Sequence, residues 1–383
     1  MRAARATLAI LAAGAAAFGA VQLARVDADV GPAFGPDRVQ RTLDAVPTPP
    51  AEQIAAARDV LDARPLDGRA YRTIALAQHR PGLLDTANAR WPRDPMTRAS
   101  LTDRALAEGD VATGLQHLDA LLRVAPELNA TFVPLLMPHL GDAGVREALA
   151  DRLSELPPWR GALFAALRDP ATSAVDADAL LAALARRAPL DDAARDTRVA
   201  VLDRAGRAAE ARALWLAALP AADRDGAGQV YDGGFEHPEV QGGYGWRFDD
   251  IPGVQIDYDT LSPRTGTSAL AVEFLDRAVK FAGVHQALAL APGHYRFEAA
   301  ARDGVSGARP FEWRITCDGG AIATLPIKRD DTWHLQSTAF DVPPDCRKQA
   351  LVLAHTGRSL EERRLQGRLL VDDLGIFLSV TNR

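Results

Sequence analysis

The first half of the chain, residues 51–220, has apolar residues spaced three and four positions apart, interrupted at intervals by Pro or Gly. This spacing is typical of amphipathic α-helices joined by short turns. In the first segment, Ile54, Ala57 and Val60 fall on one helical face. We therefore expect an all-α region over residues 51–220.

Two phrases in this region share a helix–turn–helix pattern, LAEGDVATGLQHLDALLRVAP and LDRAGRAAEARALWLAALP. Gly109 and Gly206 occupy the turns, small residues such as Ala112 and Ala209 allow the second helix to pack closely, and a Pro closes each phrase. The phrases resemble the tetratricopeptide repeat. The resemblance implies a helical-repeat solenoid with a concave, protein-binding face; the alternative is a solenoid that serves only as a spacer.

A short linker, 221–228, precedes residues 229–383, where aromatic residues, Thr and β-branched residues become frequent. Short runs of these residues alternate with turns that contain Pro or Gly, which is the pattern of a β-sandwich or barrel. The expected strands are residues 229–232, 254–257, 268–274, 284–290, 294–302, 311–317, 322–327, 333–340, 349–355 and 367–378.

Alternation along these strands predicts which side chains form the core. In FEWRITC the first, third, fifth and seventh residues share one face, which places Cys317 on a buried side. The same reasoning favours burial of Trp246, Trp313 and Trp333. The only other cysteine is Cys346, so the two form one candidate disulfide if the domain is exported, and two buried thiols if it is not.

Several phrases in residues 229–383 occur in the order found in a known family: DGGFEHP…GYGW, GTSALAVEF, VHQALALAPGHYRFEAAAR, TWHLQSTAFDVP and GRLLVDDLGIFL. Together they resemble the jelly-roll carbohydrate-binding modules of the galactose-binding-like superfamily. The resemblance implies a jelly-roll β-sandwich. It also implies a structural Ca²⁺ held by Glu236 and Asp372, with Asp373 as an optional third ligand. Hard oxygen ligands of this kind suit the ion. The alternative is that these carboxylates are solvated or act as caps.

Sugar binding needs aromatic rings for the apolar faces of the sugars and polar groups for their hydroxyls. Because the three tryptophans are expected in the core, other side chains are better candidates for an exposed binding face. These candidates are Tyr244, Tyr258, Phe281, His285 and Gln286.

Catalysis and nucleic-acid binding find little support in the sequence. The adjacent Asp pairs lie beside turns or at a strand end, which is not the arrangement of two glycosidase carboxylates, and no serine lies in a GxSxG motif. The formal net charge is -6 and there is no long basic run, which argues against a nucleic-acid partner. We therefore expect a protein that is not an enzyme.

The N-terminus carries Arg2 and Arg5 before an uncharged run over residues 6–24. As a helix this run would span roughly 28 Å, close to the thickness of a bilayer's hydrocarbon core. It predicts a signal anchor over residues 1–26 in the inner membrane, with a Pro-rich linker over 27–50 and the rest of the chain in the periplasm. The alternative is a cleaved signal peptide and a secreted protein.

These elements combine into an α + β multidomain protein: an N-terminal membrane helix, an all-α helical-repeat solenoid and a C-terminal all-β jelly-roll sandwich. The combination resembles tetratricopeptide proteins of bacterial exopolysaccharide production and export. It implies a non-catalytic scaffold that binds protein partners and polysaccharide. The rivals are a pure assembly factor with a structural sandwich, and an accessory of a glycan-active enzyme. A sandwich face closed by the segment RSLEERRLQG, residues 358–367, would favour the assembly factor.

Overall fold

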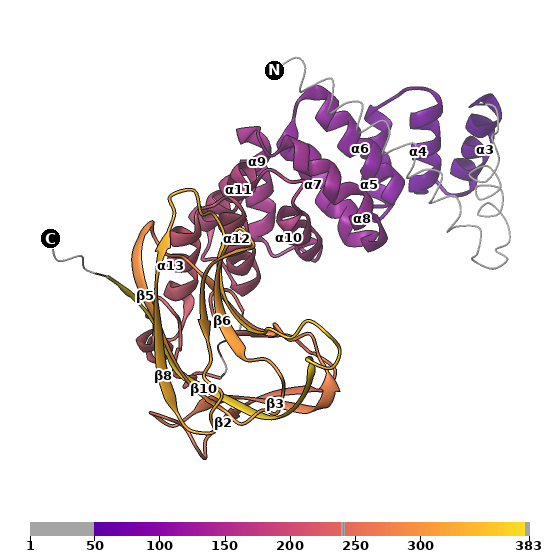
Figure 1. The fold of residues 1–383 in the computed structure, drawn as a ribbon. Coiled ribbons are helices and arrows are strands. Elements are labelled where there is room, and N and C mark those ends of the chain that lie inside the picture. Colours follow the sequence, from indigo (N-terminus) through magenta and orange to yellow (C-terminus); the bar gives the residue numbers. More distant parts are fainter. Residues whose placement is uncertain (1–49, 239, 241, 380–383) are drawn as a thin grey trace. The chain divides into compact units, whose positions relative to one another are not determined.

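The computed structural model describes residues 50–238, 240 and 242–379. In these residues eleven α-helices are followed by two antiparallel five-stranded sheets (Figure 1). The chain divides into two compact units, Met1–Thr197 and Arg198–Arg383. The predicted membrane segment, 1–26, and all of the predicted linker but its last residue lie outside the described residues.

The helical region confirms the expected all-α character of the first half. Its helices are α3 (Pro50–Ala63), α4 (Gly68–Ala77), α5 (Gly82–Arg90), α6 (Pro95–Glu108), α7 (Val111–Val124), α8 (Asn129–Leu136), α9 (Ala143–Ser154), α10 (Arg160–Arg168), α11 (Ala174–Arg187), α12 (Asp192–Arg204) and α13 (Ala208–Ala218). Helices α3, α4, α5 and α6 each pack against the next helix along the chain, and α7 packs against α9. The finer assignment to the tetratricopeptide repeat stays a prediction.

Local chemistry explains where several of these helices begin and end. Asp67, Asp94 and Asp110 precede α4, α6 and α7, and each carboxylate accepts hydrogen bonds from backbone N–H groups of the first turn. Gly109 ends α6 with a φ of 82°, a left-handed conformation that costs glycine little. Among the described residues, none of the helices taken singly combines the length and the apolar composition needed to cross a membrane. One bent pair of helices, Val111–Val124 with Pro126–His139, has both when the two are taken together.

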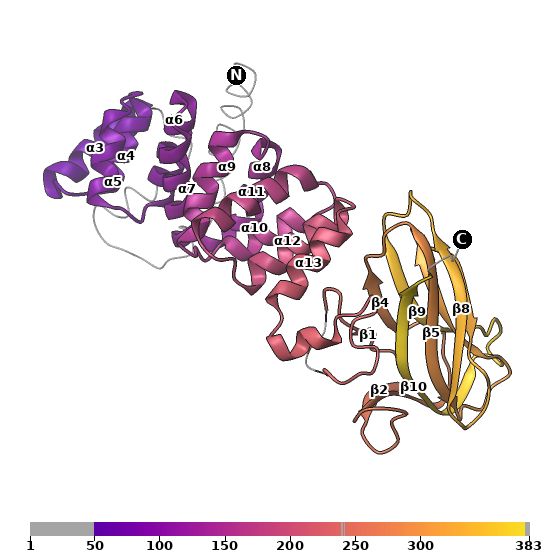
Figure 2. The same ribbon diagram turned by 90° about the vertical axis from the view of Figure 1, so that its left-hand side faces the viewer.

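The second unit contains a β-sandwich, drawn from orange to yellow in Figures 1 and 2. Its strands are β1 (Arg247–Phe248), β2 (Val254–Asp259), β3 (Ala269–Ala278), β4 (Val284–Leu288), β5 (Gly293–Asp303), β6 (Phe311–Cys317), β7 (Gly320–Pro326), β8 (His334–Val342), β9 (Gln349–His355) and β10 (Arg364–Leu378). The first sheet has the order β1-β4-β9-β6-β7, and the second has the order β2-β3-β10-β5-β8.

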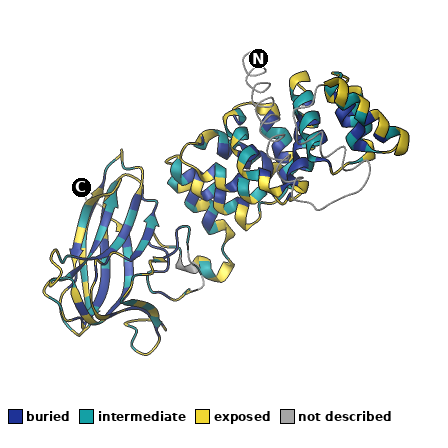
Figure 3. Ribbon diagram, turned by 90° about the vertical axis from the view of Figure 1, so that its right-hand side faces the viewer, coloured by how far each residue is buried: buried dark blue, intermediate teal, exposed yellow. Residues whose placement is uncertain are grey.

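One continuous apolar core lies between the two sheets. Buried residues alternate with more exposed ones along the strands, as Figure 3 shows. Trp246 and Trp313 are each 1% exposed and belong to this core, as predicted. The predicted burial of Trp333 is wrong: it is half-buried and outside the core cluster, because it precedes β8 at the edge of the second sheet. The expected strand 229–232 is also wrong, since only an isolated bridge joins Ala227 to Tyr231.

Helix α13 is part of the same compact unit as the sandwich. Its Trp215 packs edge-on against Tyr231, with ring centroids 4.9 Å apart, and lies 6.1 Å from the ring of Tyr244. Ala287 and Ala289, at and just after β4, pack against this aromatic cluster. The helix therefore covers part of the outer surface of the first sheet.

Candidate functional site

The outer face of the second sheet is defined by the side chains that point away from the sandwich core. In β10, Leu369, Val371, Leu374 and Ile376 belong to the core. A bulge between Asp372 and Gly375 shifts the alternation by one residue, so odd-numbered positions face the core before it and even-numbered positions face the core after it. Alternation then places Arg368, Leu370, Gly375 and Phe377 on the outer face.

Small residues make up the middle of this face. Ala271 pairs with Leu370 across β3 and β10, and Leu370 pairs in turn with Arg302 of β5. In the next row, Ala269 lies beside Asp259, and Ala300 lies between Asp372 and Leu335. Ala269, Ala271, Ala300 and Leu370 are only 0–4% exposed, so this alanine floor is covered and is not an open surface.

An aromatic ring lies at one end of the floor. Phe377 is 50% exposed although it is a large apolar side chain. Its ring folds back over Gly375, where an added Cβ would be only 2.6 Å from the ring's Cζ. The guanidinium carbon of Arg296 lies 6.0 Å from the ring centroid on the neighbouring strand. Gly375 therefore allows the ring to lie against the strand, with much of its surface open to solvent.

Polar side chains surround this ring. The strand register places Glu298 beside Gly375 and Ser337 beyond it, while Arg296 lies beside Phe377. Arg296 also pairs with Glu298 at 3.1 Å. An aromatic surface thus adjoins a guanidinium, a carboxylate and a hydroxyl.

Two further arginines lie toward the opposite end of the face. A guanidinium nitrogen of Arg368 lies 3.4 Å from Asp259 Oδ2, and the Asp259 side chain is only 2% exposed. Arg302 donates to Asp331 at 2.8 Å, and this hydrogen bond raises the pKa of Arg302. Each guanidinium is thereby held by a carboxylate but keeps a third or more of its side chain exposed.

The predicted glycan-binding residues do not come together on this face. Tyr244 and Phe281 are each 2% exposed and Gln286 is 1% exposed, so the expectation that they face solvent is wrong. Tyr244 packs in the α13 cluster, and Phe281 packs against Phe311 in the core. The Gln286 side-chain amide both accepts from and donates to the backbone of Tyr231, at 2.9 Å in each case.

The remaining two candidates are half-buried and lie apart. Tyr258 packs against the sandwich core, with its ring 6.1 Å from Phe248 in an edge-on arrangement. His285 belongs to the first sheet, where its Nδ1 lies 4.0 Å from a carboxylate oxygen of Asp249. Neither belongs to the outer face described above. Their role in binding stays a prediction.

The three predicted calcium ligands all hold one loop, residues 264–268. Glu236 accepts from the backbone N–H of Thr267 at 2.9 Å. Asp372 is fully buried and accepts from the N–H groups of Arg264 and Thr265 at 2.8 and 3.1 Å. Burial raises the pKa of Asp372. Asp373 forms an ion pair with the Arg264 guanidinium.

This arrangement does not fit one shared calcium ion. Backbone N–H groups already donate to the carboxylates of Asp372 and Glu236, and a guanidinium neutralises Asp373. Within the described residues, the one group of three metal-ligating side chains whose atoms lie within 4.8 Å of one another is Cys317, Asp318 and Cys346. Glu236, Asp372 and Asp373 are therefore loop anchors in this structure, and no function is assigned to them through a metal.

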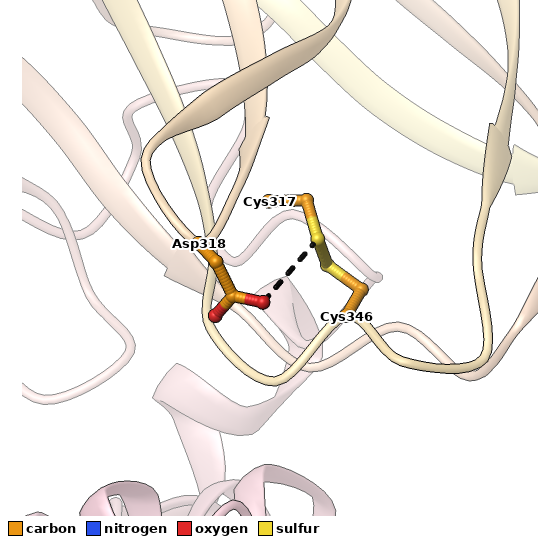
Figure 4. Close-up of side chains that lie close together, drawn as sticks. All are labelled: Cys317, Asp318 and Cys346. Atoms are coloured by element: carbon orange, nitrogen blue, oxygen red, sulfur yellow. Dashed lines mark hydrogen bonds between the residues drawn. A yellow bond between two sulfur atoms is a disulfide. The ribbon is translucent and has the colours of Figure 1, made fainter.

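The cysteine group is also structural. The sulfurs of Cys317 and Cys346 form a disulfide, with Cα atoms 5.5 Å apart (Figure 4). A sulfur in a disulfide is not the thiolate that binds metals. Asp318 accepts from the backbone N–H groups of Arg347 and Lys348 at 3.3 and 3.1 Å. The bridge and these bonds fasten the 343–348 turn to the end of β6.

Sequence comparison gives no relative: no family model matches the chain, and no curated protein matches it. Solved structures that are similar to part of this chain include carbohydrate-binding modules. The structure of TmCBM61 in complex with beta-1,4-galactotriose is 17% identical, covering 40% of this chain and 99% of that one, with a TM-score of 0.30. A xylan-binding domain of CBM 22 is 16% identical over 40% of this chain and 98% of its own, with a TM-score of 0.30.

A third structure, the CBM22-1 xylan-binding domain from Paenibacillus barcinonensis Xyn10C, is 16% identical over 35% of this chain and 85% of its own, with a TM-score of 0.27. Each of these three solved structures is similar to 35–40% of this chain.

Proposed function

We propose that the sandwich binds a polysaccharide on the outer face of its second sheet. The observation that carries the proposal is the ring of Phe377, half-exposed and lying over Gly375. Sugar rings stack on such aromatic surfaces through their C–H faces, while their hydroxyls need nearby donors and acceptors. Arg296, Glu298 and Ser337 supply those groups beside the ring.

The ligand is an extended chain rather than a single sugar. Phe377 and Arg368 lie nine positions apart on β10, which at the rise of a β-strand corresponds to roughly 30 Å. The alanine floor between them is nearly fully buried, so the polymer would contact this face at its two ends. The Arg368 and Arg302 guanidiniums, held by Asp259 and Asp331, would donate to sugar oxygens at the far end.

In this proposal the protein is a non-catalytic accessory that connects glycan to protein partners. The helical region would serve as the protein-binding scaffold, and the predicted anchor over residues 1–26 would hold the protein at the inner membrane, facing the periplasm. Such a protein would act in the production or export of an exopolysaccharide. The resemblance of the sequence phrases supports this wider role, and the geometry of the outer face supports the glycan contact.

The alternative is an assembly factor whose sandwich is a protein-contact domain. Packing of Trp215 against Tyr231 and Tyr244 favours it, because the sandwich already binds a helix on its first sheet. The segment expected to distinguish the two functions joins β9 to β10. In it, Glu362 accepts from the backbone of Arg358 and pairs with Arg309, so this segment forms a turn at the end of the sandwich.

The test uses the full chain and affinity electrophoresis against soluble β-1,4-galactan, xylan, and a panel of bacterial exopolysaccharides. At least one polymer should retard the protein, and Phe377→Ala should weaken that retardation by at least about tenfold, as loss of a central aromatic contact does. Leu378→Ala is the matched control, because Leu378 is 63% exposed and adjacent in sequence but has no ring. Gly375→Val should act like Phe377→Ala by displacing the ring.

Equal retardation of all three variants and the wild type would place binding elsewhere. No retardation by any polymer, from a folded protein, would favour the assembly factor. Circular dichroism of each variant establishes that the fold is retained.

A further inference from the structure

The connector between α5 and α6 carries an unusual group of cations. Its sequence is Trp91-Pro92-Arg93-Asp94, and it follows Arg90 at the end of α5. Arg69, from the first turn of α4, places its guanidinium 4.3 Å from the centre of the Trp91 ring. Arg98, from the first turn of α6, donates to the Pro92 carbonyl at 3.0 Å. Two arginines from different helices are thus fixed against adjacent residues of one connector.

Arg98 has no counter-ion in the part of the chain that the structure describes. Its guanidinium is half-buried, and its second contact is the Nδ1 of His117 on α7, at 3.1 Å. His117 must accept this bond, so it is the neutral tautomer with its proton on Nε2. Loss of water around Arg98 lowers the pKa of its guanidinium. By contrast, Arg104 on the same helix pairs with Asp85 through two hydrogen bonds, at 2.7 and 3.0 Å.

A partly buried cation without a carboxylate is costly, and proteins usually pair such a group. The Arg98 environment instead supplies a carbonyl oxygen and an imidazole nitrogen, which fix the orientation of the guanidinium but leave its charge uncompensated. The remaining N–H groups of Arg98 form a planar fork that matches a carboxylate. Arg69, whose guanidinium lies over the Trp91 ring, offers a second such group nearby.

We infer that this connector patch, formed by Arg69, Trp91, Arg98 and His117, binds an acidic segment of a partner protein through its Asp or Glu side chains. A short acidic segment fits better than a long polyanion. The whole chain carries a formal net charge of -6, which repels an extended polymer of negative charge at long range. The inference deepens the proposed scaffold role of the helical region and is independent of the glycan site.

The probe is a fluorescein-labelled, acetylated hexaglutamate peptide, titrated with the full chain at low ionic strength and followed by fluorescence anisotropy. Arg98→Gln and Arg69→Gln should each weaken binding about tenfold, which corresponds to loss of one charge-assisted contact. Arg168→Gln is the matched control, because Arg168 is an exposed helical arginine outside the patch and should leave affinity unchanged. Added salt should weaken the wild-type complex and reduce the difference between variants.

Two results would overturn the inference: failure of the peptide to bind the folded wild type, or equal losses in Arg98→Gln and Arg168→Gln. Polygalacturonate is included as a second probe. If it bound with the same dependence on Arg98 while hexaglutamate did not, the ligand would be an acidic glycan and not a protein segment. The electrophoresis against glycans is repeated with Arg98→Gln and Arg69→Gln. Failure of the glycan proposal can therefore be told apart from failure of the peptide-binding inference.

Discussion

Replacement of Trp215 by Ala should destabilise the sandwich, although Trp215 lies in a helix. Trp215 is 7% exposed and contacts Tyr231 and Tyr244, which lead into the first strand of the sandwich. Its ring also lies against Gly243, where an added Cβ would be 2.4 Å from the indole. Removal of the ring would therefore leave a cavity between α13 and the 229–246 segment.

The magnitude follows from the size of the side chain. A Trp→Ala change in a packed site costs about 3–5 kcal/mol. Part of that cost is the edge-on contact with Tyr231, worth about 0.5–1.5 kcal/mol beyond the area buried. For a unit the size of Arg198–Arg383, each kcal/mol lowers the melting temperature by about 2–4 °C. We expect a decrease of about 6–20 °C for the transition of this unit.

Differential scanning calorimetry of the full chain is the assay, because the two compact units should give separable transitions. Trp159→Ala is the reciprocal control. Trp159 is 3% exposed and donates to Asp119 at 2.8 Å within the helical unit. Its loss should therefore lower the melting temperature of the helical unit and not that of the sandwich. If Trp215→Ala left the sandwich transition within about 2 °C of wild type, the argument that α13 is part of this folding unit would be refuted.

Three further outcomes are expected. Chelation with EDTA should change the melting temperature of the sandwich by less than about 1 °C, because the 264–268 loop is held by hydrogen bonds; a larger decrease that calcium reverses would show a bound ion. Reduction of the Cys317–Cys346 bridge should cost about 2–4 kcal/mol in a urea titration, and a double Ser variant should be insensitive to the reductant. The Arg358 N–H and the Arg309 guanidinium lower the pKa of Glu362 to about 2 from 4.5, so this carboxylate stabilises the fold above pH 4.5 and that contribution is lost as pH falls from 4.5 toward 2. Glu362→Gln should then be less stable than wild type at pH 7 and equally stable near pH 2; a constant difference across this range would contradict the assignment.

The two-part organisation was predictable because each half has its own hydrophobic period. Strands β6 and β9 match their expected ranges, 311–317 and 349–355, since alternation and turn residues both mark them. The disulfide partners followed from cysteine count, because there was no other pair to choose. The role of α13 was not predictable, because its amphipathic pattern shows that one face is buried but not which surface buries it.

The face proposed for binding was missed for a related reason. Tyr244 and Phe281 were chosen as aromatic residues other than the tryptophans expected in the core, but tertiary packing buries both. Phe377 was passed over because it lies in an apolar strand, and the bulge before Gly375 changes the phase of alternation there. The signal for this face in the sequence was Gly375, two residues before Phe377. A glycine inside a strand often marks a close approach by another group.

The contact between Phe377 and Gly375 also predicts that residues 375 and 377 change together in evolution. Any side chain at position 375 would occupy the space of the ring, so a glycine there is needed only while an aromatic residue is kept two positions later. Homologous sandwiches should therefore gain or lose the pair together. Where the glycine is replaced, the aromatic residue should be lost from position 377 as well, and such a domain would have to recognise its ligand by another surface.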